Sequence, residues 1–274
     1  MTSDGEDYEP KEGVAVPSGA KARFTANVAA IGVLRQLEAE GRPATHSEQE
    51  TLAAWSGWGA IPDAFSGENG WQDEAERLRE ALTSEEYQAA RATTLNAHYI
   101  DPAVVSAMWD ALETTGVTQA GTILEPGSGS GNFMGRAPEG VRMIGVELDP
   151  LTARLSHYLY PSAQVRNEGF EQTAVREGMV DAAIGNVPYG SFTLHDPRHN
   201  GSQLAIHNHF IVKALDATRP GGLVAVVTSG WTMDSQGTRA RTEIARRGDL
   251  VAGVRLPTDA FSRVAGTKVN TDVL

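Results

Sequence analysis

The first regular pattern of hydrophobic residues along the chain begins at Phe24 and predicts an amphipathic helix. Apolar side chains recur there at steps of three or four residues, the period of one helix face, until Gly41 and Pro43 interrupt the pattern. The recurring positions are Phe24, Val28, Ile31, Leu34 and Leu37. Residues 1–22 mix acids with Gly, Pro and Ser and have no apolar period, so we expect a disordered acidic tail.

More helices are indicated between residues 45 and 92. Thr45, followed three positions later by Glu48, has the form of a capping box and predicts the start of a short helix. A loop rich in Gly, Pro and aromatic residues follows at 57–65. The stretch 73–91, dense in Glu, Arg, Leu and Ala, predicts one or two exposed helices. Residues 23–92 are therefore expected to form a helical appendage.

After Thr94, short β-rich runs alternate with helical stretches, the pattern of a doubly wound α/β sheet. The expected strands lie in TILEP, MIGVEL, DAAIGN, GLVAVVTS, LVAGVRL and VNTDVL. The expected helices are 102–114, 151–158, 204–217 and 234–247. In such a sheet a ligand binds at the carboxyl ends of the strands, so the binding and catalytic residues are expected at that edge.

Charge and composition narrow the classes of function. The 23 Lys and Arg against 35 Asp and Glu give a net charge of −12, so we expect weak DNA binding by this chain alone. The absence of cysteine excludes disulfides, thiolate metal sites and cysteine nucleophiles. The N-terminal residues lack the apolar stretch of a secretory signal, and no apolar run approaches the roughly 18–20 residues of a membrane helix. We therefore expect a cytoplasmic protein without a membrane partner.

A glycine-rich turn follows the strand that begins at Thr122. Glycines at 127, 129 and 131 form a G-x-G-x-G loop, which predicts a strand, a tight turn, the start of a helix and a nucleotide-like ligand. The spacing is not that of the dinucleotide fingerprint, and no G-K-[ST] follows, so a P-loop is excluded.

Two acids flank this loop. Glu125 stands at its mouth, where a carboxylate would repel a pyrophosphate but suit a cation such as the ammonium and sulfonium of S-adenosylmethionine. Glu147 ends the next strand and is placed to accept hydrogen bonds from ribose hydroxyls.

The segment Asn186-Val187-Pro188-Tyr189 ends the strand after that and carries the most specific chemistry. An exocyclic amine is a poor nucleophile because its lone pair is delocalised. The side-chain oxygen of Asn186 and the backbone carbonyl of Val187 can accept its two N–H bonds, while Pro188 stiffens the turn. Tyr189 can stack on a planar substrate. The alternative is an Asn-Pro turn that closes a buried strand, with Tyr189 in the core.

The two motifs in this order resemble those of S-adenosylmethionine-dependent amino-methyltransferases, whose acceptor motif reads Asn-Pro-Pro-aromatic; Val187 replaces the first proline here. Residues 50–274 resemble the adenine-N6 DNA methylase domain that precedes Swi/Snf-type helicases in phage, plasmid and mobile-element proteins. The segments that carry this resemblance are GWGAIPDAF, TTLNAHYIDPAVVSAMW, ILEPGSGSGNFMG, IGNVPYGSF, VTSGWTMDSQ, RLPTDAF and AGTKVNTDVL.

This resemblance implies a Rossmann-like class I methyltransferase with a seven-stranded sheet, its catalytic domain covering residues 93–274. It assigns His98 and Tyr99 to a segment over the methionine end of the cofactor, and Phe170 to the cofactor adenine. The implied cofactor residues also include Glu125, Gly127, Gly129, Gly131, Glu147 and Asn186, and the implied acceptor residues are Asn186, Val187, Pro188 and Tyr189. Gly169 stands where relatives often have an adenine-reading acid, and Glu168 and Glu171 are poor substitutes for it.

Other residues allow competing interpretations. His195, His199, His207 and His209 have spacings that can bind zinc, but Asp196-Pro197 interrupts any shared helix face, so we expect no metal. Tryptophans 55, 58 and 71 either stack bases or pack the appendage onto the sheet. Trp231 is either an aromatic wall for the target or a core residue. The arginines crowded near the C-terminal end form either a solvated helix surface or a basic face for nucleic acid.

Three hypotheses of function follow. In the first, the protein flips an adenine out of DNA and methylates N6, assisted by a helicase or DNA-recognition module in cis or in trans, in restriction-modification or antirestriction. In the second, the acceptor is a glutamine amide of a protein or a base amine of RNA. In the third, suggested by the departures at Val187 and Gly169, the chain is a cofactor-binding module with little turnover in an antirestriction or defence complex.

Overall fold

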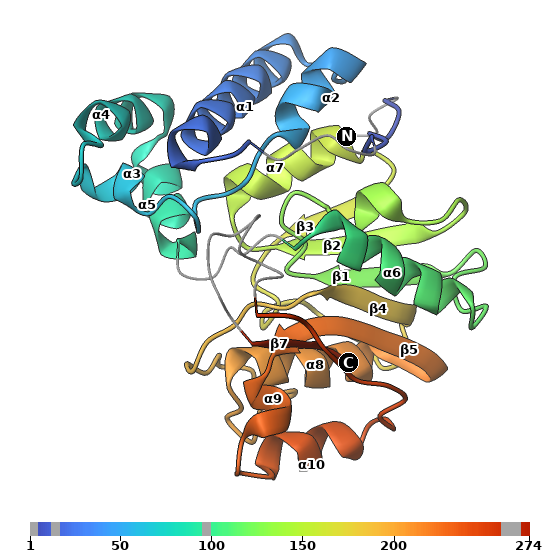
Figure 1. The fold of residues 1–274 in the computed structure, drawn as a ribbon. Helices are drawn as coiled ribbons and strands as arrows, with labels where there is room; N and C mark the ends of the chain where they lie inside the picture. Colours follow the sequence, from blue (N-terminus) through green and yellow to red (C-terminus); the bar gives the residue numbers. More distant parts are fainter. Residues whose placement is uncertain (1–4, 12–16, 95–99, 259–269) are drawn as a thin grey trace.

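The computed structural model describes residues 5–11, 17–94, 100–258 and 270–274, and a single mixed sheet lies at its centre (Figure 1). The sheet has seven strands in the order β3-β2-β1-β4-β5-β7-β6. The strands are β1 (Thr122–Pro126), β2 (Arg142–Glu147), β3 (Gln164–Asn167), β4 (Val180–Asn186), β5 (Thr218–Ser229), β6 (Val254–Arg255) and β7 (Thr271–Val273). Strands β1 to β5 are parallel, and β7 is antiparallel to both β5 and β6. The predicted doubly wound sheet is confirmed.

Two strands differ from the sequence prediction. No strand was expected at β3. Its four residues are half-buried or exposed, and Val165 is their one apolar residue, so the sequence has no alternation of apolar and polar residues there. The run LVAGVRL was expected to be a full strand, but only Val254 and Arg255 pair. The short β7 is their only neighbour among the described strands, so Leu250 and Val251 remain exposed.

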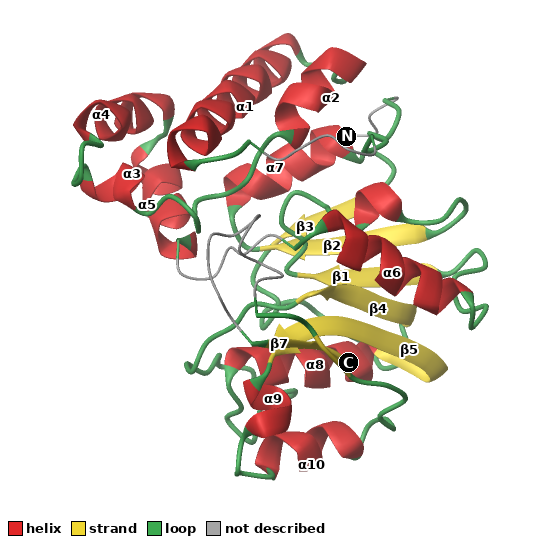
Figure 2. Cartoon of the chain, in the orientation of Figure 1, coloured by secondary structure: helices red, strands yellow, loops and turns green. Residues whose placement is uncertain are grey.

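Helices cover both faces of the sheet (Figure 2). Side chains alternate across a strand, so Ile123 packs in the cluster that contains α6 and α7, whereas Leu124 packs in the cluster that contains α8. The helices of this part are α6 (Pro102–Glu113), α7 (Pro150–Leu159), α8 (Ile206–Ala217), α9 (Trp231–Asp234) and α10 (Arg239–Ala245). The helix expected over 234–247 is shorter, because α10 starts only at Arg239.

The helical appendage packs on α7, on the side away from the sheet (Figure 1). Its helices are α1 (Ala20–Glu40), α2 (His46–Ala53), α3 (Asp63–Ser66), α4 (Gln72–Ala81) and α5 (Ser84–Thr93). The predicted capping box of Thr45 and Glu48 is present at α2. Glu86 of α5 is buried and forms ion pairs with Arg35 of α1 and Arg154 of α7, which joins the appendage to the sheet layer.

Residues 5–11 lie against the folded chain, which differs from the disordered tail expected there. The ring of Tyr8 is buried, and its backbone N–H donates to the carbonyl of Leu159 at 2.8 Å. Asp7 accepts from the backbone N–H of Ser162 at 2.9 Å. One aromatic side chain with local acceptors is enough to order a polar segment whose average composition predicts disorder.

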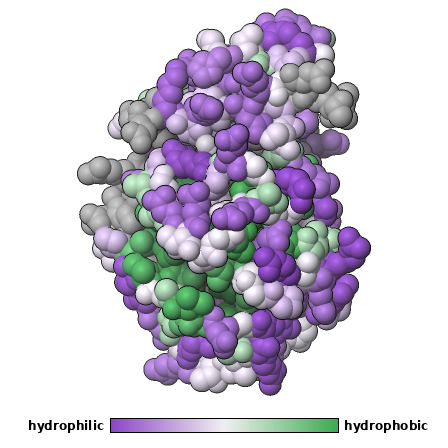
Figure 3. Space-filling model, turned by 90° about the vertical axis from the view of Figure 1, so that its right-hand side faces the viewer, coloured by the Kyte–Doolittle hydropathy of each residue, from purple (hydrophilic) through white to green (hydrophobic). Residues whose placement is uncertain are grey.

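An apolar area lies on one face of the described part of the molecule (Figure 3). Figure 3 shows the face on the right-hand side of Figure 1, where hydrophobic residues gather in the lower half. None of the helices within the described ranges is long and apolar enough to cross a membrane.

Candidate active site

A cavity of about 490 Å³ lies at the carboxyl ends of β1, β2 and β4. Its lining brings together most of the residues singled out in the sequence: Glu125, Gly127, Gly129, Glu147, Phe170, Asn186 and Pro188. Gly131, Val187 and Tyr189 lie next to these residues in sequence but outside the lining, and His98 and Tyr99 lie outside the described residues. The glycine loop, the two acids and the acceptor motif therefore share one cavity.

The glycine loop needs glycine for two physical reasons. All three glycines have positive φ, with values of 71° at Gly127, 56° at Gly129 and 90° at Gly131, a conformation that other residues rarely adopt. A Cβ atom at Gly131 would also lie 2.6 Å from the ring of Tyr160. The expectation of a helix directly after the loop is wrong. Turns lead only to the 3₁₀ helix η1 (Met134–Arg136).

The loop is tied to the second acid. The backbone N–H groups of Gly127 and Ser128 both donate to the carbonyl of Val146 at 2.9 Å. The N–H of Gly129 donates to Oε2 of Glu147 at 2.8 Å. Glu147 Oε1 accepts from the N–H of Asp149 at 2.7 Å, so the carboxylate is fixed at the end of β2.

Both acids hold their protons more tightly than usual. Burial raises the pKa of Glu147 to about 7, although the hydrogen bonds from the backbone N–H groups of Asp149 and Gly129 act in the opposite direction. Burial raises the pKa of Glu125 well above its ordinary value, and the negative charge of Glu147 raises it further. The cavity therefore has two carboxyl groups whose ionisation would be favoured by a positive or hydrogen-bond-donating ligand.

Several buried polar atoms of the cavity have no hydrogen-bond partner among the described residues. These atoms are Glu125 Oε2, Ser128 Oγ, Asp149 Oδ1 and Trp58 Nε1. Buried polar groups are nearly always paired, so unpaired acceptors and donors around one cavity indicate a polar ligand. The two unpaired carboxylate oxygens, Glu125 Oε2 and Asp149 Oδ1, fit the ammonium, sulfonium and hydroxyl groups of S-adenosylmethionine.

The far end of the cavity is aromatic. Phe170 lines it and packs against Phe210 with ring centroids 4.8 Å apart. The carboxylate of Glu171 lies against Gly169, in the space that a side chain at position 169 would occupy. Glu171 also lines the cavity, so its acid lies near the place where Gly169 lacks one. The carboxylate of Glu171 thus lies where a side chain at position 169 would lie.

The acceptor motif lies directly against the glycine loop. A Cβ atom at Gly127 would lie 3.6 Å from Pro188. Tyr189 donates its hydroxyl to Asn186 Oδ1 at 2.6 Å, and the Val187 N–H donates to the carbonyl of Val227 at 3.1 Å. The side chain of Val187 is buried. Asn186 is thus held at the end of β4 by its own loop.

Sequence reasoning missed several residues of the lining. Leu148 and Phe192 are exposed large apolar side chains beside Glu147 and the acceptor motif, respectively. Their positions directly after two predicted site motifs were a usable signal. Trp58 reaches the cavity from the appendage, and no pattern in the sequence indicated that contact.

Comparisons with known proteins bear on the fold of the chain. No family model matches the chain. Over 92% of its length the chain is 26% identical to Defense against restriction protein B of Escherichia phage P1, of which it spans 10%. A Listeria monocytogenes protein assigned as a class I S-adenosylmethionine-dependent methyltransferase aligns with a TM-score of 0.54 at 15% identity, covering 93% of this chain and 87% of that one. The methyltransferase subunit of a type I restriction-modification system from Streptococcus thermophilus aligns with a TM-score of 0.52 at 16% identity. The alignment covers 93% of this chain and 78% of that subunit.

The fold is that of the Rossmann-like class I methyltransferases. Within such a fold, a cavity at the carboxyl ends of the strands is the expected ligand site.

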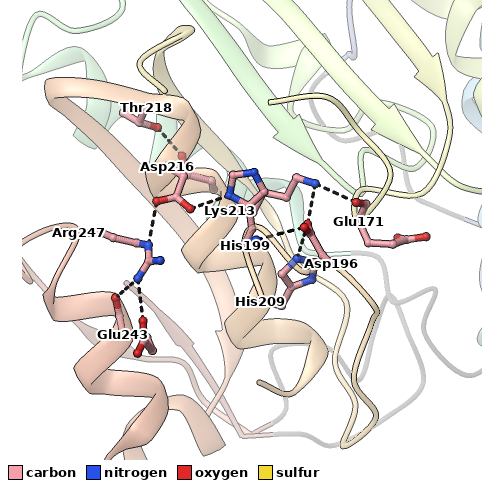
Figure 4. A network of polar contacts seen from close by, with 10 residues as sticks. Glu171, Asp196, His199, His209, Lys213, Asp216, Thr218, Glu243 and Arg247 are labelled. Carbon is pink, nitrogen blue, oxygen red and sulfur yellow. Dashed lines mark hydrogen bonds and ion pairs between the residues drawn. The ribbon is translucent and has the colours of Figure 1, made fainter. Parts of the chain in front are cut away.

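Two of the four clustered histidines, His199 and His209, belong to a network of polar contacts around α8 (Figure 4). His199 Nδ1 lies 2.7 Å from Asp216 Oδ2, and His209 Nε2 lies 3.1 Å from Asp196 Oδ2. Within the described ranges, no group of three or more His, Cys, Asp or Glu residues could hold a metal ion.

Lys213 is the centre of this network. Its side chain is 1% exposed, and its ammonium donates to Asp196 Oδ2 at 2.8 Å and to the Glu171 carbonyl at 3.1 Å. It also lies 5.3 Å from the ring centroid of Phe170. Burial would raise the pKa of Asp196, but hydrogen bonds from Lys213, the His199 backbone and His209 lower it to about 2.

We expect Lys213→Met to lower the free energy of unfolding by about 3 kcal/mol, because it leaves the buried Asp196 carboxylate without its cation. The double variant Lys213→Met/Asp196→Asn removes both charges and should recover part of the loss. Urea unfolding followed by circular dichroism measures both. A loss below about 1 kcal/mol for the single variant would show that the buried pair contributes little.

The C-terminal arginines are largely neutralised. Arg247 pairs with Asp216 and Glu243, and Arg255 pairs with Asp272 and Asp234. Arg241 donates to three backbone carbonyls, those of Thr232, Met233 and Ser235. Within the described residues, this cluster forms an ion-paired surface more than a free basic face.

Trp231 is not a core residue. Its side chain is 71% exposed and follows β5, whose end pairs with β7. The tryptophans at 55, 58 and 71 are all buried, so in this structure they pack the appendage and are not available to stack bases.

Proposed function

We propose that this chain transfers a methyl group from S-adenosylmethionine to the N6 amine of adenine in DNA. The single observation that supports this most is the contact between the acceptor motif and the cofactor loop, with Pro188 against Gly127 and Asn186 in the same cavity as Glu125 and Glu147. The relationship to the phage P1 protein and to type I restriction-modification subunits supports a DNA substrate.

S-adenosylmethionine supplies an electrophilic methyl group on a sulfonium. Glu125 would balance its positive charges, and Glu147 would accept from the ribose hydroxyls. Asn186 Oδ1 has two lone pairs, so it can keep the Tyr189 hydroxyl and also accept an N–H of the target amine. That hydrogen bond places the amine and increases the electron density at its nitrogen as the new bond forms.

Binding of the target depends on a surface that this chain supplies only in part. Its net charge of −12 and its paired arginines support weak DNA binding alone. We propose that a helicase or DNA-recognition module, in cis or in trans, delivers the DNA. Phe192, which is exposed and lines the cavity, can stack on an extruded base, and Trp231, exposed just after β5, is a second aromatic candidate.

Mass spectrometry of nucleosides tests the reaction. Unmethylated DNA, total RNA and a glutamine-containing protein extract are each incubated with the protein and S-adenosylmethionine. New N6-methyladenine in DNA supports the proposal. Methylated RNA bases or glutamines would instead support the second hypothesis, in which the methyl acceptor is an RNA base amine or a protein glutamine amide. Cofactor binding without any methylated product would support the low-turnover module.

Cofactor affinity should depend on pH because Glu147 has a pKa of about 7. Its ionised form is the one that accepts from the ribose hydroxyls, so affinity rises as pH rises through 7. We expect binding about tenfold weaker at pH 6 than at pH 8, measured by isothermal titration calorimetry. Glu147→Gln is the control, since it should bind weakly with little change between these pH values. A flat profile in the wild-type protein would contradict the assignment.

A further inference from the structure

The indole nitrogen of Trp58 is a buried hydrogen-bond donor that no other described residue pairs with. Its side chain is 1% exposed and lines the cavity, yet its indole N–H has no hydrogen-bond partner among the described residues. An indole nitrogen can only donate, and a buried donor is nearly always paired. Because Trp58 lines the cavity, a ligand there would supply the acceptor that this donor lacks.

The surroundings of Trp58 hold the ring in place. It packs edge-on against Trp55 and Phe65, with ring centroids 5.2 Å and 5.4 Å apart. Gly57, the preceding residue, has a φ of 63°, and its carbonyl accepts from the side chain of Asn27 at 2.7 Å. A ring fixed in this way is pre-organised for a ligand, because little side-chain freedom is lost on binding.

Other residues of the appendage line the same cavity. Gly57 and, from α5, Ala89, Ala92 and Thr93 form a wall opposite the strand ends. Three of these four side chains are glycine or alanine, so Trp58 is the large polar-tipped group that the appendage contributes. The appendage is thus part of the cavity and is more than a support for α7.

We propose that Trp58 is a cofactor-binding residue that donates its indole N–H to an oxygen or nitrogen acceptor of S-adenosylmethionine. The inference rests on the proposed function, because it takes this cofactor as the occupant of the cavity. It makes the helical appendage necessary for cofactor affinity.

The chain contains a matched control for this proposal. Trp55 is also buried at 2% exposure, its indole N–H is also unpaired among the described residues, and it contacts Trp58. Trp55 does not line the cavity. Replacing either ring with phenylalanine removes one indole N–H from the same cluster, and only Trp58 lines the cavity.

The test measures binding of S-adenosylmethionine and S-adenosylhomocysteine by isothermal titration calorimetry, without any methyl acceptor. We expect Trp58→Phe to weaken both by about fivefold to tenfold, and Trp55→Phe to change them less than twofold. Urea unfolding of the ligand-free variants controls for packing. Equal affinities in the two variants would overturn the proposal, whereas a wild-type protein that binds neither ligand would overturn the proposed function itself.

A second measurement needs no change at Trp58 in the protein that binds the ligand. In ¹H–¹⁵N spectra of the wild-type protein, through-space contacts to assigned neighbouring residues identify the indole resonances of Trp55 and Trp58. Addition of S-adenosylhomocysteine should move the Trp58 indole proton downfield, as a new hydrogen bond does, and leave that of Trp55 nearly unchanged. An unmoved Trp58 resonance at saturating ligand would overturn the proposal even if Trp58→Phe failed to fold.

Discussion

Asn186→Ala should lower kcat for methyl transfer by about 10³-fold and weaken cofactor binding far less than it slows the reaction. The reason is that Asn186 supplies the acceptor oxygen that would hold the target amine, and the cofactor acids Glu125 and Glu147 lie on other strands. Transfer of tritiated methyl groups to DNA measures the rate, and calorimetry measures the affinity. Wild-type turnover in this variant would place the acceptor site elsewhere.

Two further variants separate the roles of the oxygen and of its orientation. Asn186→Asp keeps an oxygen acceptor at the same position, so we expect it to retain much more activity than Asn186→Ala. Tyr189→Phe removes the hydroxyl that donates to Asn186 at 2.6 Å, and we expect about a tenfold loss in kcat with little change in cofactor affinity. A larger loss for Tyr189→Phe than for Asn186→Ala would mean that the tyrosine hydroxyl, and not the Asn186 oxygen, carries the reaction.

The parts of the site that the sequence predicted correctly depend on local geometry. Three glycines at alternate positions after a strand permit positive φ values, and acids at strand ends meet at the sheet edge whatever lies between them. The pairing of Thr45 with Glu48 is a short-range contact and was equally readable. Such features are decided within a few residues of chain.

The parts that could not be predicted depend on long-range contacts. Trp58 meets the cavity because the appendage packs on α7, and Tyr8 is ordered because it contacts a chain segment about 150 residues away. The absence of a helix after Gly131 also follows from packing, since the turn there lies against Tyr160. Periodicity carries no information about these contacts.

Glu125→Gln should weaken cofactor binding and stabilise the ligand-free protein. Glu125 is buried, its Oε2 has no hydrogen-bond partner among the described residues, and burial raises its pKa well above the ordinary value. In the unfolded chain the same carboxyl ionises at its ordinary pKa. Above that pKa, Glu125 is ionised in the unfolded chain and still protonated in the folded protein. The free energy of unfolding therefore falls as pH rises, until Glu125 also ionises in the folded protein. The neutral amide of glutamine does not ionise, so this loss of stability disappears. It also lacks the negative charge that would attract the cationic cofactor.

At pH 7.5 we expect Glu125→Gln to raise the Tm of the ligand-free protein by about 3 °C. We expect it to weaken S-adenosylmethionine binding by about 100-fold, because a buried charge loses its partner. Thermal unfolding with and without the cofactor measures both effects, which have opposite signs and so cannot both come from a damaged fold. Glu113→Gln, the same change on an exposed acid at the end of α6, should leave both quantities unchanged. A Glu125→Gln protein that is less stable without ligand would mean that its carboxylate supports the fold and is not held there for the cofactor.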